Sequence, residues 1–344
     1  MDITSSSADS ASGGLSDHQP SATTVAYEAD PNADGVAMIE IEGLRKFYGQ
    51  YEALCGISFT VRQGEILGFL GPNGAGKSTT MKIMTGLIPP TAGSVRVAGF
   101  DVLDDPLEVR RAIGYLPEIP PIYPEMVVRD FLLFAAEIRG VPRARRKQAL
   151  EYAIERCGLE KVAKRLVGNL SKGYRQRVGL AQAVIHGPRI LILDEPTVGL
   201  DPTQVIEIRS IVSEIGRERT VILSSHILPE VQATCQRVVI INNGLVVARG
   251  GIDDLLAQAS GGRLVITLRR PPADISQIES LPGNPQVTAL GEGEFGIDLA
   301  NEADLREAFV RELAAADYGL MHVKPETTSL ETVFRNVVLE EAEA

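Results

Sequence analysis

The stretch Gly71-Pro72-Asn73-Gly74-Ala75-Gly76-Lys77-Ser78-Thr79 decides the fold of this 344-residue chain. It fits the pattern G-x-x-x-x-G-K-[ST], whose backbone cradles phosphate groups. The apolar run 65–70 before it predicts a buried strand, and residues 79–85 predict a helix that ends at Gly86. A strand, a glycine-rich loop and a helix N-terminus together direct backbone N–H groups and the positive end of the helix dipole at an anion. This context predicts a nucleotide-binding loop rather than an ordinary glycine-rich turn.

The loop also carries the side chains that phosphate binding needs. Gly74 and Gly76 let the backbone approach the phosphates, and Lys77 is long enough to reach the β and γ oxygens. Ser78 offers its hydroxyl to Mg²⁺, a hard cation that prefers oxygen ligands. We therefore expect a magnesium–nucleotide complex at this loop.

A second apolar run, Ile190–Leu193, ends in the acids Asp194 and Glu195. Asp194, at the carboxyl end of a predicted strand, is expected to hold the water shell of Mg²⁺ beside Ser78. Glu195 follows directly and projects differently, so it is expected to polarise a water aimed at the γ-phosphate. A strand that ends in a solvated acidic turn is the alternative, and the phosphate loop upstream argues against it.

Composition narrows the classes of protein to consider. The apolar fraction is 44%, and no stretch approaches 18 uninterrupted apolar residues, so no membrane span is expected. The three cysteines are far apart, which fits a reduced cytosol and predicts neither a disulfide framework nor a zinc site. Residues 1–35 carry six acids and no bases, and residues 255–344 have a net charge of −8. The total is −11, so residues 36–254 have a net charge of +3. Nucleic-acid binding is therefore not expected, and the basic run 143–147 is interpreted as a solvated helix face.

Hydrophobic periodicity predicts an α/β core with a mostly helical insert. Residues 1–35 are expected to form a disordered acidic tail. Half-buried strands are predicted at 38–41 and 57–61, and fully buried parallel strands at 189–194 and 220–224. Helices are predicted at 103–113, 127–139, 143–157 and 204–215.

The pattern changes at about residue 261. A strand at 264–268, a helix at 273–280, a hairpin over 287–299 that turns at 291–293, a helix at 302–315 and a strand at 320–323 follow one another. This β-α-β-β-α-β order predicts a small α+β domain of the ferredoxin-like arrangement. A last helix, from Ser329 to about residue 340, has an apolar side that needs a partner surface. Docking on its own domain is favoured over an external contact.

The stretch Leu170-Ser171-Lys172-Gly173-Tyr174-Arg175-Gln176-Arg177 opens another predicted helix, with Ser171 as its N-cap. Together with the phosphate loop and the acidic strand end, in this order, it resembles the nucleotide-binding subunits of ATP-binding-cassette (ABC) transporters over residues 38–255. The resemblance implies a P-loop ABC ATPase domain at 36–258, with a mixed sheet core and a helical subdomain at about 118–185. The C-terminal ferredoxin-like accessory domain would span 259–344.

The resemblance also implies a role for each matching residue. Tyr48 is similar to the aromatic residue that stacks on adenine, and Gly71, Pro72, Asn73, Gly74, Ala75, Gly76, Lys77, Ser78 and Thr79 form the phosphate loop. Ser171 and Gly173 of the signature are expected to meet the γ-phosphate, and Asp201 belongs to a D-loop. The implied catalytic residues are Lys77, Glu195 and the switch histidine His226, and the implied Mg²⁺ ligands are Ser78, Asp194 and Glu118.

Two features depart from the pattern of the family. Glu118 stands where the Q-loop has a glutamine, and residues 170–174 read Leu-Ser-Lys-Gly-Tyr. A carboxylate still offers oxygen to Mg²⁺. These variants resemble the branch that serves type-two exporters, which includes gliding-motility-like and multidrug-like subunits.

In this family the signature of one subunit closes the ATP site of its twin. The resemblance therefore implies a head-to-tail homodimer, or a pair of ABC subunits, with two ATP molecules between them. Closure of the dimer would drive a separate permease chain, with this chain cytoplasmic and peripheral on the cytoplasmic face of the cell membrane. One alternative is a soluble ABC ATPase that is not coupled to transport. The other is a scaffold that binds ATP without turnover, against which the intact residues Lys77, Asp194, Glu195 and His226 argue.

Overall fold

The computed structural model describes residues 35–259, 263–272, 274–291, 293–299, 303–325 and 329–335. The expected N-terminal tail up to residue 34, the tip of the predicted hairpin at Glu292 and the last helix beyond residue 335 lie outside the described residues.

A six-stranded sheet forms the centre of the cassette, in the order β10-β9-β3-β8-β7-β6. Its strands are β3 (Ile66–Leu70), β6 (Ile113–Leu116), β7 (Ile190–Asp194), β8 (Thr220–Ser225), β9 (Arg237–Asn242) and β10 (Leu245–Gly251). All neighbours pair in parallel except β10, which is antiparallel to β9. Every residue of β3, β7 and β8 is buried, as expected for parallel strands that are covered on both faces.

A second, antiparallel sheet has the order β2-β1-β4-β5. It consists of β1 (Ala37–Tyr48), β2 (Tyr51–Arg62), β4 (Ala92–Val97) and β5 (Phe100–Asp101). Helix α1 (Lys77–Met84), which follows the phosphate loop, buries Met81, Ile83 and Met84 in a core that both sheets share. The phosphate loop is therefore anchored to both sheets of the cassette.

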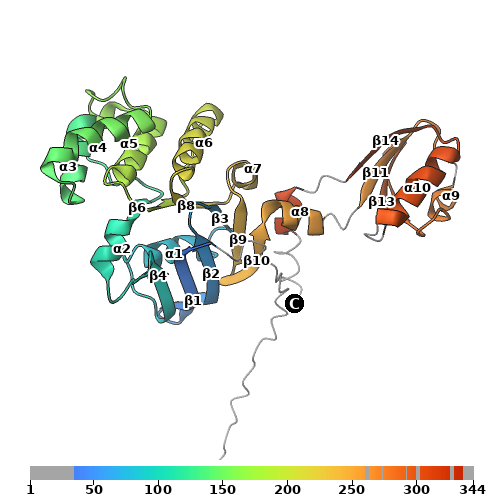
Figure 1. Cartoon of the computed structure of the whole chain (residues 1–344), viewed down its shortest axis with the longest axis horizontal. Coiled ribbons are helices and arrows are strands. Elements are labelled where there is room, and N and C mark those ends of the chain that lie inside the picture. The colour runs from blue at the N-terminus through green and yellow to red at the C-terminus, as the bar shows by residue number, and fades with distance from the viewer. Residues whose placement is uncertain are drawn as a thin grey trace, which may run out of the picture.

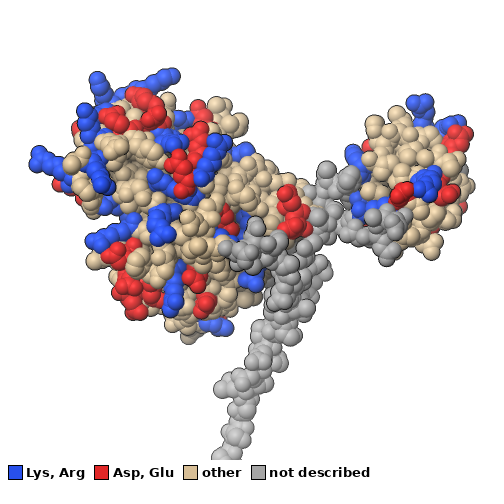
Figure 2. Space-filling view, in the orientation of Figure 1, with Lys and Arg blue, Asp and Glu red and all other residues tan. Residues whose placement is uncertain are grey.

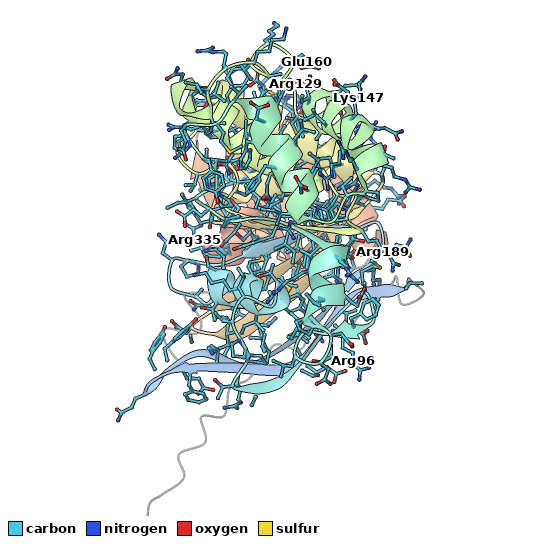
Figure 3. The ribbon with its side chains drawn as sticks, turned by 90° about the vertical axis from the view of Figure 1, so that its left-hand side faces the viewer. Arg96, Arg129, Lys147, Glu160, Arg189 and Arg335 are labelled. Carbon is cyan, nitrogen blue, oxygen red and sulfur yellow. The ribbon has the colours of Figure 1, made fainter. Side chains whose placement is uncertain are left out.

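The opposite face of the six-stranded sheet is covered by helices. Alternation along β7 divides its residues, because Leu191 and Leu193 face this second core while Ile190 and Ile192 face the first. Covering elements include α3 (Val128–Ile138), α4 (Arg143–Arg156), the 3₁₀ turn Val167–Asn169, α5 (Lys172–Val184) and α6 (Pro202–Gly216). Figure 3 shows this helical part at one end, with Arg129, Lys147 and Glu160, and Arg96 of β4 at the other.

Shorter helices complete the cassette: α2 (Pro106–Ala112), α7 (Leu228–Gln232) and α8 (Ile252–Ala259) (Figure 1). The helix predicted at 103–113 is shorter than expected, since Pro106 occupies its first turn and Ile113 already begins β6. The predicted strands 38–41 and 57–61 are parts of the longer β1 and β2.

Beyond the cassette, the strands β11 (Leu264–Leu268), β12 (Gln286–Gly291), β13 (Glu294–Asp298) and β14 (Leu320–Pro325) form an antiparallel sheet. Helices α9 (Ser276–Glu279) and α10 (Ala303–Ala315) lie between them in the sequence. The strand order is β12-β13-β11-β14. Ile266, Phe295 and Ile297 of the sheet share a core with Phe309 and Leu313 of α10, separate from the two cores of the cassette.

The helical residues 330–335 belong to a different core from the sheet they follow. Leu330 is fully buried and Val333 is 4% exposed, and both lie in the helix-covered core of the cassette together with Ile252 and Leu255 of α8. The apolar side of this helix therefore docks on the cassette and not on the C-terminal sheet. The expectation that 259–344 packs as one unit does not hold for these residues.

Candidate functional site

The sequence-predicted residues converge at the carboxyl edge of the parallel sheet. The phosphate loop follows β3, Glu118 follows β6, Glu195 follows β7 and His226 follows β8. Because these strands are parallel neighbours, their carboxyl ends meet at one edge. A cavity of about 370 Å³ opens there, lined by Tyr48, Tyr51, Ala53, Asn73, Gly74, Gly76, Lys77, Ser78, Thr79, Glu118, Glu195, Val198 and His226.

The backbone of the loop needs glycine at its two central positions. Gly74 and Gly76 have φ of 84° and 107°, in the left-handed region that other residues rarely adopt. A Cβ at Gly76 would also lie 2.8 Å from the carbonyl oxygen of Ala53. The loop therefore passes directly against β2, where any side chain at this position would collide with the strand.

Lys77 is held by the loop that it belongs to. Its Nζ donates to the carbonyl oxygens of Gly71, at 2.8 Å, and Pro72, at 3.3 Å. The same ammonium lies 3.4 Å from Glu195 Oε1, and both side chains are less than a tenth exposed. Two buried charges of opposite sign thus face each other across the cavity floor.

Asp194 and Ser78 place two oxygens side by side. Ser78 Oγ donates to Asp194 Oδ1 at 3.3 Å, and Ser224 Oγ donates to the same oxygen at 2.6 Å. Ser224 comes from β8, where it stands opposite Asp194 in the parallel register. Ser224 was not among the predicted residues, although its place at the end of the next predicted strand was a usable signal.

Glu195 adopts a left-handed backbone conformation, with φ of 48°. Such a conformation is uncommon for a residue with a side chain and is found where the surroundings enforce it. Here the N–H of Glu195 donates to Ser224 Oγ at 2.9 Å, and the side chain lies 2.8 Å from His226 Nδ1. This backbone conformation explains why the side chains of two consecutive acids have different partners. Asp194 contacts Ser78, whereas Glu195 contacts Lys77 and His226.

The cavity wall contains one predicted aromatic residue and one that was not predicted. Tyr48, at the end of β1, is 49% exposed, and Lys46 Nζ lies 5.5 Å from the centre of its ring. Tyr51, which opens β2, lines the same cavity and is 61% exposed. Because the turn between β1 and β2 carries both rings, two flat apolar faces are available to a planar ligand.

Seven predicted residues do not line this cavity: Gly71, Pro72 and Ala75 of the phosphate loop, Asp194, and the signature and D-loop residues Ser171, Gly173 and Asp201. Ser171 caps α5 by accepting from the N–H of Tyr174 at 3.4 Å, and Asp201 caps α6 by accepting from that of Gln204 at 3.0 Å. Gly173 lies against α6, where a Cβ would come within 2.6 Å of Gln204. Within one chain, the signature and D-loop residues are thus set apart from the phosphate loop.

The chemistry of the donor set fits Mg²⁺. Among the residues that the structure describes, no group of three or more His, Cys, Asp and Glu could hold a metal. Mg²⁺ does not require one, since it keeps several waters and takes one or two carboxylates together with phosphate oxygens. The adjacent oxygens of Ser78 and Asp194 are ligands of that kind.

Comparison with known proteins agrees with this geometry. Residues 54–198 match the family model described as ABC transporter. The chain is 32% identical to the linearmycin resistance ATP-binding protein LnrL of Bacillus subtilis, over 87% of this chain and 98% of that protein. It is 39% identical to the bacitracin transport ATP-binding protein BcrA of Bacillus licheniformis, over 63% of this chain and 71% of that protein.

A solved structure has the same cassette. It is the dimeric structure of MJ0796, a bacterial ABC transporter cassette, with a TM-score of 0.57 and 26% identity over 62% of this chain and 98% of that one. In the described part of the chain, no helix is long and apolar enough to cross a membrane. The family model covers the phosphate loop and the acidic strand, and the match to LnrL covers nearly the whole length of that protein. The chain therefore belongs to the family of ABC transporter ATP-binding proteins.

Proposed function

We propose that this chain hydrolyses ATP in the cavity at the carboxyl edge of its parallel sheet, and that it uses the reaction to drive export through a separate permease. ATP binding and hydrolysis belong to the family as such. The arrangement that supports their assignment to particular residues is the contact of Glu195 with both Lys77 and His226.

Each side chain has a distinct task in this proposal. Lys77 and the loop N–H groups stabilise negative charge on the β and γ phosphates. Glu195 accepts the proton of the attacking water, and His226 orients Glu195 through the 2.8 Å contact with its Oε2. Tyr48, which lines the cavity and is 49% exposed, stacks on the adenine ring.

Mg²⁺ would be held by Ser78 and Asp194, and Glu118 lines the same cavity as Ser78. The ion supplies charge neutralisation for the phosphates and orients them. Ser224 fixes the Asp194 carboxylate toward Ser78, so the ligand pair is positioned by the protein itself.

Two subunits would be needed to complete each site. Ser171 and Gly173 lie apart from the cavity of their own chain. They stand at the N-terminus of α5, where the Ser171 side chain is the N-cap. We infer that this end of α5 meets the γ-phosphate bound by a second subunit in a head-to-tail dimer. The similar cassette MJ0796 has been solved as a dimer, which supports this assembly.

Coupling to export is inferred from relatives named for resistance and for bacitracin transport. In this proposal the dimer sits on the cytoplasmic face of the cell membrane through its contact with a permease chain, and nucleic acid is not a partner. Residues 36–258 carry the ATPase, and the sheet β11–β14 is an accessory unit. A soluble ATPase that is not coupled to transport remains the second candidate.

The test combines two measurements on the full chain. Phosphate release from ATP, compared between the wild type and Glu195→Gln, tests hydrolysis in the assigned cavity. Affinity purification of the tagged chain from detergent-extracted membranes, followed by mass spectrometry, tests coupling. Recovery of a multispanning chain supports the transporter, whereas active ATPase that never recovers one supports the soluble alternative.

A further inference from the structure

A second cavity of about 370 Å³ opens at the other edge of the parallel sheet. Its lining includes Gly187, just before β7 begins at Ile190, and Arg219, just before β8 begins at Thr220. The ATP cavity lies where the same strands end, so the two cavities are at opposite ends of β7 and β8. Figure 3 shows Arg189 of this edge between the helical part of the cassette and the antiparallel sheet.

The charged lining of this cavity is entirely basic. Arg139, Arg145 and Arg219 line it, and its lining contains no Asp or Glu. None of the three arginines has an ion pair among the described residues: Arg139 Nη1 donates to the carbonyl oxygen of Arg110 at 3.4 Å, and Arg219 Nη2 donates to the Tyr152 hydroxyl at 3.2 Å. Arg219 Nη1 is buried without a partner. Three guanidinium charges around a concave surface favour an anion.

Two other arginines of the same region, Arg156 and Arg146, form ion pairs with carboxylates. The guanidinium of Arg156 lies 5.5 Å from the ring centre of Tyr152, but it pairs with Glu214 and Glu218. Arg146, one residue after Arg145, pairs with Glu137. Arg156 and Arg146 therefore have carboxylate partners that the three arginines of the cavity lining lack.

His186 adds a hydrogen-bond acceptor to the same wall. Burial lowers the pKa of its imidazole to about 4, and the Arg139 charge acts in the same direction, so the ring is neutral near pH 7. Its Nε2 lies 3.1 Å from the carbonyl oxygen of Ile113 and must therefore carry the hydrogen. Its Nδ1 is left as an acceptor, and this atom is buried with no partner.

The start of α4 contributes further positive potential. This 14-residue helix begins at Arg143, directly after Pro142 of the cavity lining, and no side chain caps it. The positive end of its dipole therefore adds to the field of the arginines.

We propose that this cavity is a binding site for a small phosphate-bearing ligand, either inorganic phosphate or a phosphate monoester, held by Arg139 and Arg219. Their planar groups match two phosphate oxygens each. The acceptor on His186 favours inorganic phosphate over sulfate, because at neutral pH inorganic phosphate keeps at least one hydroxyl to donate and sulfate has none. The site is separate from the ATP cavity and does not depend on the function proposed for it.

The test measures binding of inorganic phosphate to the full chain by titration calorimetry at constant ionic strength, with sulfate as the second probe. The double variant Arg139→Gln, Arg219→Gln removes both guanidinium groups, and Arg156→Gln is the matched control. Phosphate should bind the wild type and the control equally, and bind the double variant at least about tenfold more weakly, since two charge-assisted hydrogen-bond donors are lost. Sulfate should bind the wild type more weakly than phosphate.

Two controls show whether the cassette is intact in each variant. One is thermal melting in the absence of phosphate, and the other is the affinity of the variant for ATP. If the double variant does not fold, Arg219→Gln alone replaces it. Phosphate binding that is unchanged in a folded variant, phosphate that does not bind the wild type, or sulfate that binds as tightly as phosphate would each overturn the proposal. Binding of a monoester such as glycerol phosphate that is tighter than that of inorganic phosphate would identify the organic form as the ligand.

Discussion

Glu195 Oε2 lies 2.8 Å from His226 Nδ1, while the other oxygen of the same carboxylate lies 3.4 Å from Lys77 Nζ. The Glu195 and Lys77 side chains are each less than a tenth exposed, whereas the His226 side chain is 42% exposed, so the carboxylate joins a buried cation to a partner at the cavity surface. Glu195 is thus the central member of a three-residue group that comes from the ends of β7 and β8 and the start of α1. If this group performs the chemistry, substitutions of Glu195 and His226 will affect hydrolysis far more than ATP binding.

Glu195→Gln tests the proposed base. The amide retains the shape of the carboxylate but cannot accept the proton of water, so hydrolysis should slow by about 10²–10⁴-fold, while ATP still binds. Steady-state phosphate release and ATP titration measure the two quantities, with the exposed Glu218→Gln as control. A variant that hydrolyses ATP at the wild-type rate would remove Glu195 from the mechanism.

His226→Ala, alone and together with Glu195→Gln, tests whether the two residues act as one unit. Because His226 is proposed to orient Glu195, its effect should vanish once the carboxylate is absent, and the double variant should be no slower than Glu195→Gln. The readout is kcat for all four proteins of the cycle. Effects that multiply in the double variant would show that His226 acts independently of Glu195.

Ser224→Ala tests the residue that the sequence analysis missed. Its hydroxyl donates to Asp194 and accepts from the strained Glu195 backbone, so its loss leaves two buried polar groups short of a partner, at a cost of about 1–3 kcal/mol. We expect lower thermal stability and a fall in kcat. The neighbouring Ser225→Ala is the control, since the Ser225 hydroxyl accepts from the Ile227 N–H and contacts neither Asp194 nor Glu195 in the described structure. Equal kcat in both variants would rule out a positioning role for Ser224.

Lys77→Ala should weaken ATP binding itself, because it removes a positive charge from the β and γ phosphates. Lys82→Ala, on the exposed side of the same helix, should leave the affinity unchanged. Titration calorimetry with ATP separates the two variants. Identical affinities for Lys77→Ala and the wild type would contradict the assignment of the phosphate loop.

Most of the ATP cavity was predictable because its determinants are local. The phosphate loop and the acids after β7 are contiguous motifs, and parallel pairing then brings them together without further information. The hairpin β9–β10 was missed, although the apolar run 238–241 and the Asn243-Gly244 turn are its signals. The left-handed conformation of Glu195 was not predictable, because it arises from packing around Ser224 rather than from a local preference.

The burial of Leu330 in the cassette could not be predicted from the sequence pattern either. The spacing of apolar residues shows that a helix needs a partner surface but does not show which surface.

Leu330→Ala tests the contact between this helix and the cassette. Truncating a fully buried leucine should destabilise the cassette by about 2–5 kcal/mol, whereas Leu290→Ala, at a side chain that is 46% exposed on β12, should change little. Thermal melting with and without ATP identifies the cassette transition, because ligand binding raises the melting temperature of the unit that binds it. If the ATP-sensitive transition is the same in Leu330→Ala as in the wild type, the helix does not stabilise the cassette. If it falls as expected, a chain shortened to end at residue 259 will be less stable than the full chain even though it keeps every residue of the ATP cavity.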